Sequence, residues 1–90
     1  MARFLVERYF PEGLLLPMTD DGARTANEVI QHNSQLGVTW LHSYVTDDRT
    51  KSFCVYDAPD AEAIRKAAFL NDLPVGTVTR VRVLDPYFYF

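Results

Sequence analysis

The sequence is short of cysteine, glycine and long apolar runs, and each shortage excludes a class of protein. Its 90 residues include one cysteine, Cys54, so no disulfide can form within the chain. The stretch MARFLVERYF is too short and too charged to be a signal peptide or a membrane span. The four glycines, Gly13, Gly22, Gly37 and Gly76, are isolated and form no phosphate-binding loop. We therefore expect a cytoplasmic protein without a membrane partner.

Positive charge is also scarce, and this argues against a nucleic-acid partner. The chain has nine Lys and Arg against twelve Asp and Glu, which gives a formal net charge of -3 at pH 7. The basic residues are scattered along the sequence, whereas a protein that binds a phosphate backbone gathers them into a patch or stripe. No nucleic acid is expected to bind.

Apolar residues are abundant, at 48% of the chain. Ninety residues suffice for one hydrophobic core, so residues 1–90 are expected to form a single domain with an aromatic tail at 85–90. A chain of this size buries only about 60–65% of its surface on folding. Association with a second copy is a natural source of further stability. We therefore expect a homodimer.

The pattern of apolar residues predicts four strands and two helices. The expected strands are rich in branched and aromatic residues and span 3–9, 38–45, 52–58 and 77–84. The expected helices have apolar residues at helical spacing and span 20–36 and 59–71. The order β-α-β-β-α-β predicts an α+β, ferredoxin-like fold with an antiparallel sheet of strand order 4-1-3-2. Both helices are expected on one face of that sheet.

Alternation along each strand divides the side chains between the two faces. One set is apolar and is expected to pack under the helices: Phe4, Val6, Leu41, Val45, Phe53, Val55, Val81 and Val83. The other set mixes aromatic, polar and charged side chains: Leu5, Glu7, Tyr9, Trp40, His42, Tyr44, Cys54, Tyr56, Arg80 and Arg82. A mixed face of this kind is expected to meet the sheet of a second copy and to enclose a ligand cavity. The candidate ligand-binding residues are Glu7, Trp40, His42, Tyr44, Cys54, Tyr56, Arg80 and Arg82.

Four segments together show a family resemblance: FLVERYFPEG, GVTWLHSYVTDD, KSFCVYDAPDAEAIRKAA and LPVGTVTRVRVLDPYFY. They resemble a bacterial family of small domains of unknown function that includes an actinobacterial nickel-binding protein. The resemblance implies a ferredoxin-like fold dimerised as an α+β barrel, and binding of a divalent metal such as nickel. The second expected helix has no histidine at 65–71, where metal-binding members have them. His42, Glu7 and Cys54 are then the candidate inward ligands.

Single residues allow more than one interpretation. His42 is either a general base or metal ligand near neutral pH, or a hydrogen-bonded residue of the dimer interface. His32 falls on the polar side of its helix and is expected to be solvated. Cys54 is expected to be a small buried hydrophobe, because nothing nearby in the sequence would lower its pKa. Arg8 is expected to point toward the helix side or the strand edge.

The remaining polar candidates are also open to two interpretations. Glu7 with Arg80 and Arg82 forms either an anion-binding site or an ion-pair network between the first and last strands. Tyr44 and Tyr56 either donate hydrogen bonds in a pocket or pack as aromatic residues of the interface.

Three functions are compatible with these residues. The first is a non-catalytic homodimer that binds a small ligand or a divalent metal such as nickel through His42 and Glu7. The second is a cofactor-free isomerase, cyclase or monooxygenase, in which His42 moves a proton and Tyr56 or Arg80 stabilises an oxyanion. The third is a dimerisation module without a site.

Overall fold

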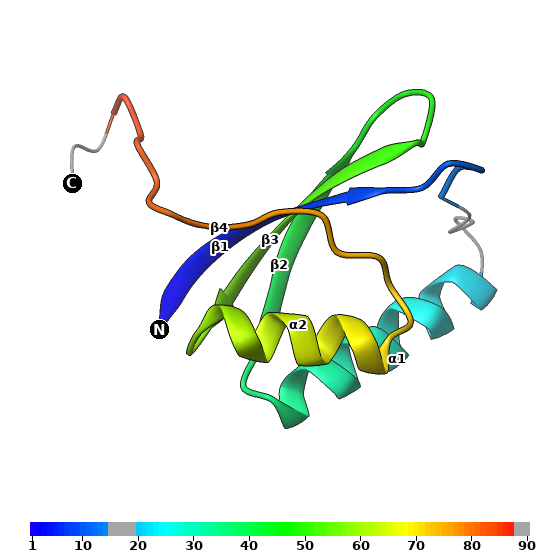
Figure 1. Cartoon of the computed structure of the whole chain (residues 1–90), viewed down its shortest axis with the longest axis horizontal. Helices are drawn as coiled ribbons and strands as arrows, with labels where there is room; N and C mark the ends of the chain where they lie inside the picture. Colours follow the sequence, from blue (N-terminus) through cyan, green and yellow to red (C-terminus); the bar gives the residue numbers. More distant parts are fainter. Residues whose placement is uncertain (15–19, 88–90) are drawn as a thin grey trace.

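The computed structural model describes residues 1–14 and 20–87 (Figure 1). The last three residues of the expected aromatic tail, 88–90, lie outside this range. The elements are β1 (Ala2–Tyr9), α1 (Asp20–Gln35), β2 (Thr39–Val45), β3 (Lys51–Ala58), α2 (Ala61–Leu70) and β4 (Val78–Val81). The predicted order is confirmed, although β4 is shorter than expected and leaves Arg82 and Val83 beyond its end.

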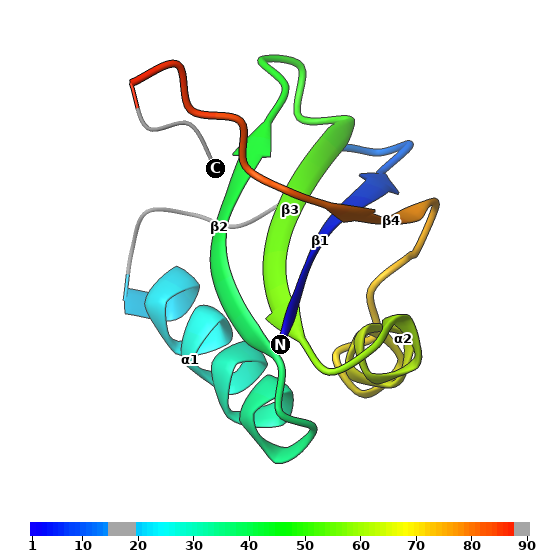
Figure 2. The same ribbon diagram turned by 90° about the vertical axis from the view of Figure 1, so that its left-hand side faces the viewer.

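The strands form one antiparallel sheet of order β2-β3-β1-β4. Both helices lie on the same side of it, with α1 beneath β2 (Figures 1 and 2). The predicted α+β, ferredoxin-like topology is therefore confirmed. None of the helices in the described part of the chain has the length and apolar character needed to cross a membrane.

The core lies between the sheet and α2. Ala63, Ile64, Ala67 and Ala68 are buried at the spacing that places them on one side of a helix. The Asp60 side chain caps this helix by accepting a hydrogen bond from the Ala63 backbone N–H at 2.8 Å. The sheet contributes Phe4, Val6, Cys54, Tyr56 and Ala58 to the same cluster.

A polar network joins the ends of the two helices. The His32 Nδ1 lies 2.6 Å from the Asn71 Oδ1, and the Asn71 Nδ2 donates to the Asn33 Oδ1 at 3.1 Å. Asn33 is buried and His32 is half-buried. The expectation that His32 is merely solvated was wrong, because Asn71 at the end of α2 binds it.

The predicted division of the sheet faces was correct for β1 and wrong for β3. Phe4 and Val6 point toward the helices, as expected. On β3, however, Cys54 and Tyr56 are buried on the helix side, so Phe53 and Val55 occupy the other face. Residues paired across antiparallel strands share a face, and Val6 pairs with Cys54.

On β2 the expected face was right for His42 and Tyr44 and wrong for Trp40, and on β4 the expected faces were wrong. The pairing of β2 with β3 shifts between Trp40 and His42, so Trp40 pairs with Tyr56 on the helix side and His42 pairs with Val55 on the other. On β4 the expected sides are reversed, since Arg80 pairs with Phe4 and Val81 with Arg3. Of the other residues expected under the helices, Leu41 and Val83 are exposed.

Candidate functional site

The sheet face turned away from the helices, here called the open face, combines apolar and polar side chains. Its members are Arg3, Leu5, Glu7 and Tyr9 of β1, His42 and Tyr44 of β2, Phe53, Val55 and Asp57 of β3, and Thr79 and Val81 of β4. Leu5, Phe53 and Val55 are only partly buried, and Tyr9 and Tyr44 are 57% and 64% exposed. No helix covers this face in the described part of the chain.

His42 and Tyr44 form an exposed aromatic pair on the open face. Their ring centroids lie 5.2 Å apart at an interplanar angle of 82°, which is an edge-to-face arrangement. Within the described residues the His42 ring makes no hydrogen bond to another side chain. Its nitrogens are therefore accessible to water, a metal ion or a partner.

Glu7 lies on the same face as His42, but β3 separates their strands. The Glu7 Oε2 accepts a hydrogen bond from the Thr77 hydroxyl at 2.8 Å. Among residues 1–14 and 20–87, Glu7 forms no ion pair with Arg80 or Arg82, so the predicted network between the first and last strands was wrong. The ion pair on this face joins the Arg3 Nε to the Asp57 Oδ1 at 3.0 Å.

The described donors of one chain do not form a complete metal centre. Within the described residues, no group of three or more His, Cys, Asp or Glu side chains could hold a metal ion. The Cys54 thiol is buried on the helix side, 3.6 Å from the Ser52 hydroxyl, and is separated from His42 by the sheet. A metal held at His42 would need donors beyond the described residues of one chain.

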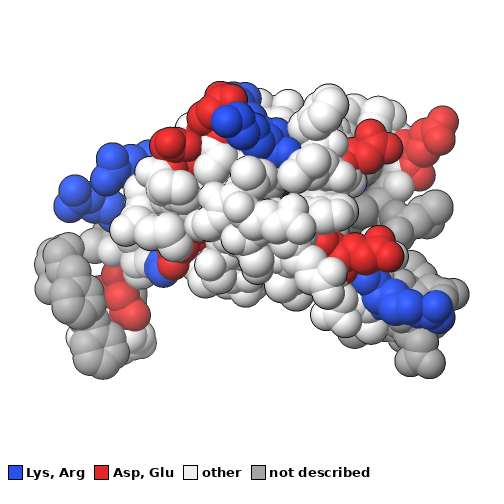
Figure 3. Space-filling view, turned by 90° about the horizontal axis from the view of Figure 1, so that it is seen from below, with Lys and Arg blue, Asp and Glu red and all other residues white. Residues whose placement is uncertain are grey.

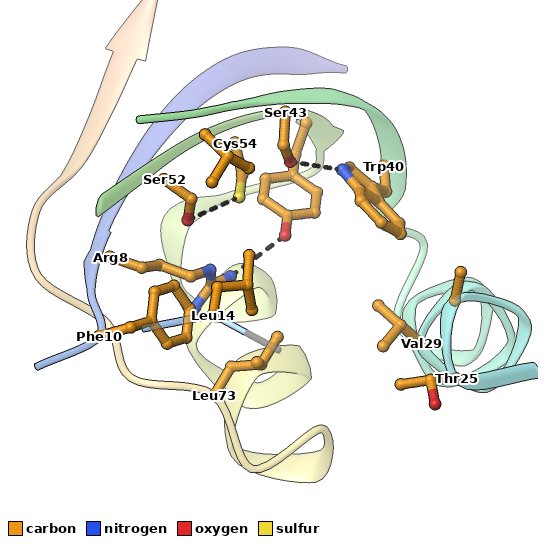
Figure 4. A pocket seen from close by; sticks show the side chains of 13 residues that line it. Arg8, Phe10, Leu14, Thr25, Val29, Trp40, Ser43, Ser52, Cys54 and Leu73 are labelled. Carbon is orange, nitrogen blue, oxygen red and sulfur yellow. Dashed lines mark hydrogen bonds between the residues drawn. The ribbon is translucent and has the colours of Figure 1, made fainter. Parts of the chain in front are cut away.

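Three predicted site residues, Trp40, Cys54 and Tyr56, come together on the helix side of the sheet. They line a cavity of about 210 Å³ between the sheet and α1, which we call the Arg8 cavity (Figure 4). His42 faces the opposite side, so the two residues proposed for an enzyme, His42 and Tyr56, do not share a cavity in one chain. The Trp40 indole N–H donates to the Ser43 hydroxyl at 2.8 Å.

Arg8 is the residue of this cavity whose role the sequence did not reveal. Its side chain points to the helix side, as predicted, and is only 4% exposed. The guanidinium donates to the Pro74 carbonyl at 2.6 Å and to the Tyr56 hydroxyl at 3.1 Å. Its position two residues after Val6 in an alternating strand was the available signal, because it places a cation on the core side.

Burial raises the pKa of Tyr56, and the nearby Arg8 charge partly offsets this rise. The Arg8 Cζ lies 6.0 Å from the centroid of the Tyr56 ring. Tyr56 is therefore a neutral phenol at physiological pH, and it accepts a hydrogen bond from the guanidinium without neutralising it.

Charge on the helix side of the molecule is dispersed. Seen from below, Lys and Arg alternate with Asp and Glu around a largely uncharged centre, and no sign dominates this view (Figure 3). This face therefore offers no basic patch.

The topology is that of a ferredoxin-like α+β domain, and residues 4–81 match the model of a family described as nickel responsive protein SCO4226-like. The chain belongs to that family. A solved structure described as SCO4226 from Streptomyces coelicolor A3(2) has a similar fold, with a TM-score of 0.72 and 15% sequence identity. The similarity covers 93% of this chain and 100% of that one. No curated protein matches the chain significantly.

Proposed function

We propose that this protein is a non-catalytic, homodimeric nickel-binding protein in which His42 of two copies binds the metal. The observation on which this proposal depends is the exposed His42 ring, which has no hydrogen-bond partner among the described residues and lies on a sheet face without helices. Imidazole is a favourable ligand for nickel. The family description, nickel responsive protein, supports the choice of metal.

A second copy would complete what one chain lacks. A two-fold dimer presents every interface residue twice, so a histidine near the axis meets its own counterpart. Glu7 is the other donor of the open face that is not engaged in an ion pair within the described residues, and its carboxylate would supply oxygen ligands. Asp57 is less suitable because Arg3 already neutralises it.

The composition of the open face supports its role as the dimer interface. Leu5, Phe53 and Val55 form an apolar strip, and the exposed rings of Tyr9 and Tyr44 flank it. Aromatic residues are enriched in the buried centres of protein interfaces, whereas monomers rarely expose continuous apolar patches. Covering this strip with the same strip of a second copy would remove it from water.

Nickel titration of three variants tests the proposal. Isothermal titration calorimetry should find one nickel ion per two wild-type chains and no uptake by His42→Ala. The matched control is His32→Ala, which removes the chain's other histidine; it should bind nickel like the wild type.

Sedimentation velocity on the same samples should report a dimer for the wild type and for His42→Ala. Tyr44→Glu, which adds a charge to the open face, should give a monomer that binds nickel weakly. Undiminished nickel binding by His42→Ala, or by monomeric protein, would contradict the proposal.

A further inference from the structure

The Arg8 cavity is independent of the open face, because the sheet lies between them. It is bounded by side chains of β1, β2, β3 and α1 and by the segments that follow β1 and α2. Most of the lining is apolar, with Phe10, Leu14, Val29 and Leu73 among its members (Figure 4). The cavity is thus largely apolar, with one charged side chain, Arg8, in its lining.

The charge of that group has no counter-ion within the described part of the chain. A guanidinium has five N–H donors and remains protonated in proteins. Two donors of Arg8 are used, and both acceptors, the Pro74 carbonyl and the Tyr56 hydroxyl, are neutral. The Nε is buried and has no hydrogen-bond partner. Among the carboxylates of residues 1–14 and 22–87, none forms an ion pair with Arg8.

An uncompensated buried cation is costly, and proteins normally pair such charges. The counter-ion that would neutralise Arg8 is a group with one negative charge and oxygen acceptors, because a guanidinium binds such a group through parallel hydrogen bonds. One guanidinium balances a monoanion, whereas a phosphate dianion would leave net charge buried in the apolar lining. The volume of about 210 Å³ is below the range of about 300–1,000 Å³ that holds drug-sized ligands. These properties together define a small monoanion with an apolar body.

We propose that the Arg8 cavity binds a small monocarboxylic acid whose aliphatic or aromatic body fills the apolar lining while its carboxylate pairs with Arg8. The terminal N–H groups of Arg8 that are not already engaged bind the carboxylate. The Tyr56 hydroxyl stays hydrogen-bonded to the guanidinium and orients it. The acid is held away from His42, so binding it does not depend on nickel.

Fluorescence titration of the full chain tests this assignment. Trp40 is the chain's single tryptophan and lines the cavity, so its emission reports occupancy directly. The probe is sodium 4-methylpentanoate, and the control is 4-methylpentan-1-ol, which has the same carbon skeleton without the charge. The acid should bind saturably and about tenfold more tightly than the alcohol, or better. Equal affinities, or no saturable binding of the acid, would overturn the proposal.

Three variants separate the effects of the Arg8 charge, the cavity space and His42 on binding of the acid. Arg8→Met should reduce the affinity for the acid to that of the alcohol, whereas unchanged acid binding would refute the role of the guanidinium. Ala26→Phe fills the cavity from α1 and should abolish binding of both probes, with circular dichroism confirming the fold. This variant and the alcohol comparison decide the question if Arg8→Met does not fold. His42→Ala should bind the acid like the wild type. Failure of the wild-type protein to bind nickel would therefore not contradict binding of the acid at Arg8.

Discussion

Substitution of Gly76 by alanine should weaken the attachment of β4 to β1. The Gly76 N–H donates to the Glu7 carbonyl at 2.9 Å, and the Glu7 N–H donates to the Thr77 carbonyl at 3.0 Å. A Cβ at position 76 would lie 2.8 Å from the Glu7 carbonyl oxygen, well inside an ordinary contact of 3.4–4 Å. The obstacle is backbone within a sheet, so it cannot rotate away as a side chain would. The two strands must separate by roughly half an ångström or more, which strains both hydrogen bonds.

The expected cost follows from that overlap. Overpacking against rigid surroundings typically costs about 1–3 kcal/mol. In a domain of this size each kcal/mol lowers Tm by about 4–8 °C, so Gly76→Ala should melt roughly 5–20 °C below the wild type. Displacement of this segment also moves Pro74, whose carbonyl accepts from Arg8. The variant should therefore bind 4-methylpentanoate more weakly than the wild type.

Urea denaturation followed by circular dichroism provides the free energies of unfolding. The matched control is Thr77→Val, a substitution next to Gly76 in the sequence. It removes an exposed hydrogen bond from the Thr77 hydroxyl to the Glu7 side chain. This control should change the free energy of unfolding by no more than about 0.5 kcal/mol. If Gly76→Ala were as stable as Thr77→Val, the steric argument would be refuted.

Two further predictions concern capping and pH. Asp60→Ala should lower the free energy of unfolding by about 1 kcal/mol, because it removes the acceptor for the Ala63 N–H at the start of α2, while Asp60→Asn should stay close to the wild type in urea denaturation. In the turn between β2 and β3, hydrogen bonds from Thr50 and Thr46 lower the pKa of Asp48 from 3.8 to about 2. A carboxyl whose pKa is lowered by folding stabilises the fold at pH values above its pKa in the unfolded chain. This contribution should therefore be lost as the pH falls from about 4 through 2. An NMR titration of Asp48 with a midpoint near 3.8 would contradict this, and Asp48→Asn should lack the pH dependence.

The fold was predictable because its signals are local. Asp60 and Gly37 mark helix ends, and β1 pairs with β3 without a register shift, so the parity that assigns Phe4 and Val6 to the core holds along the strand. Gly37 has a φ of 71°, the left-handed conformation that favours glycine just beyond a helix. Such features depend on neighbours in sequence and need no knowledge of the tertiary structure.

The site was less predictable because its geometry depends on pairing between strands. On β3 both parities are apolar or aromatic, so alternation alone could not tell whether Phe53 or Tyr56 faces the helices. On β2 a single register shift separates Trp40 from His42, so Trp40 lies on the helix side although alternation placed both residues on the other face. One of the two acceptors of Arg8 is the Pro74 carbonyl, 66 residues away in the chain, and no local pattern predicts such a contact.

Nickel binding by His42 between two copies is tested by a crystal structure of the nickel-loaded protein, with anomalous diffraction recorded on both sides of the nickel absorption edge. We expect an anomalous peak between the open faces of two copies, from a nickel ion bonded to a nitrogen of His42 from each copy. A peak at His32 or the amino terminus, with His42 in solvent, would contradict it. So would open faces that do not meet.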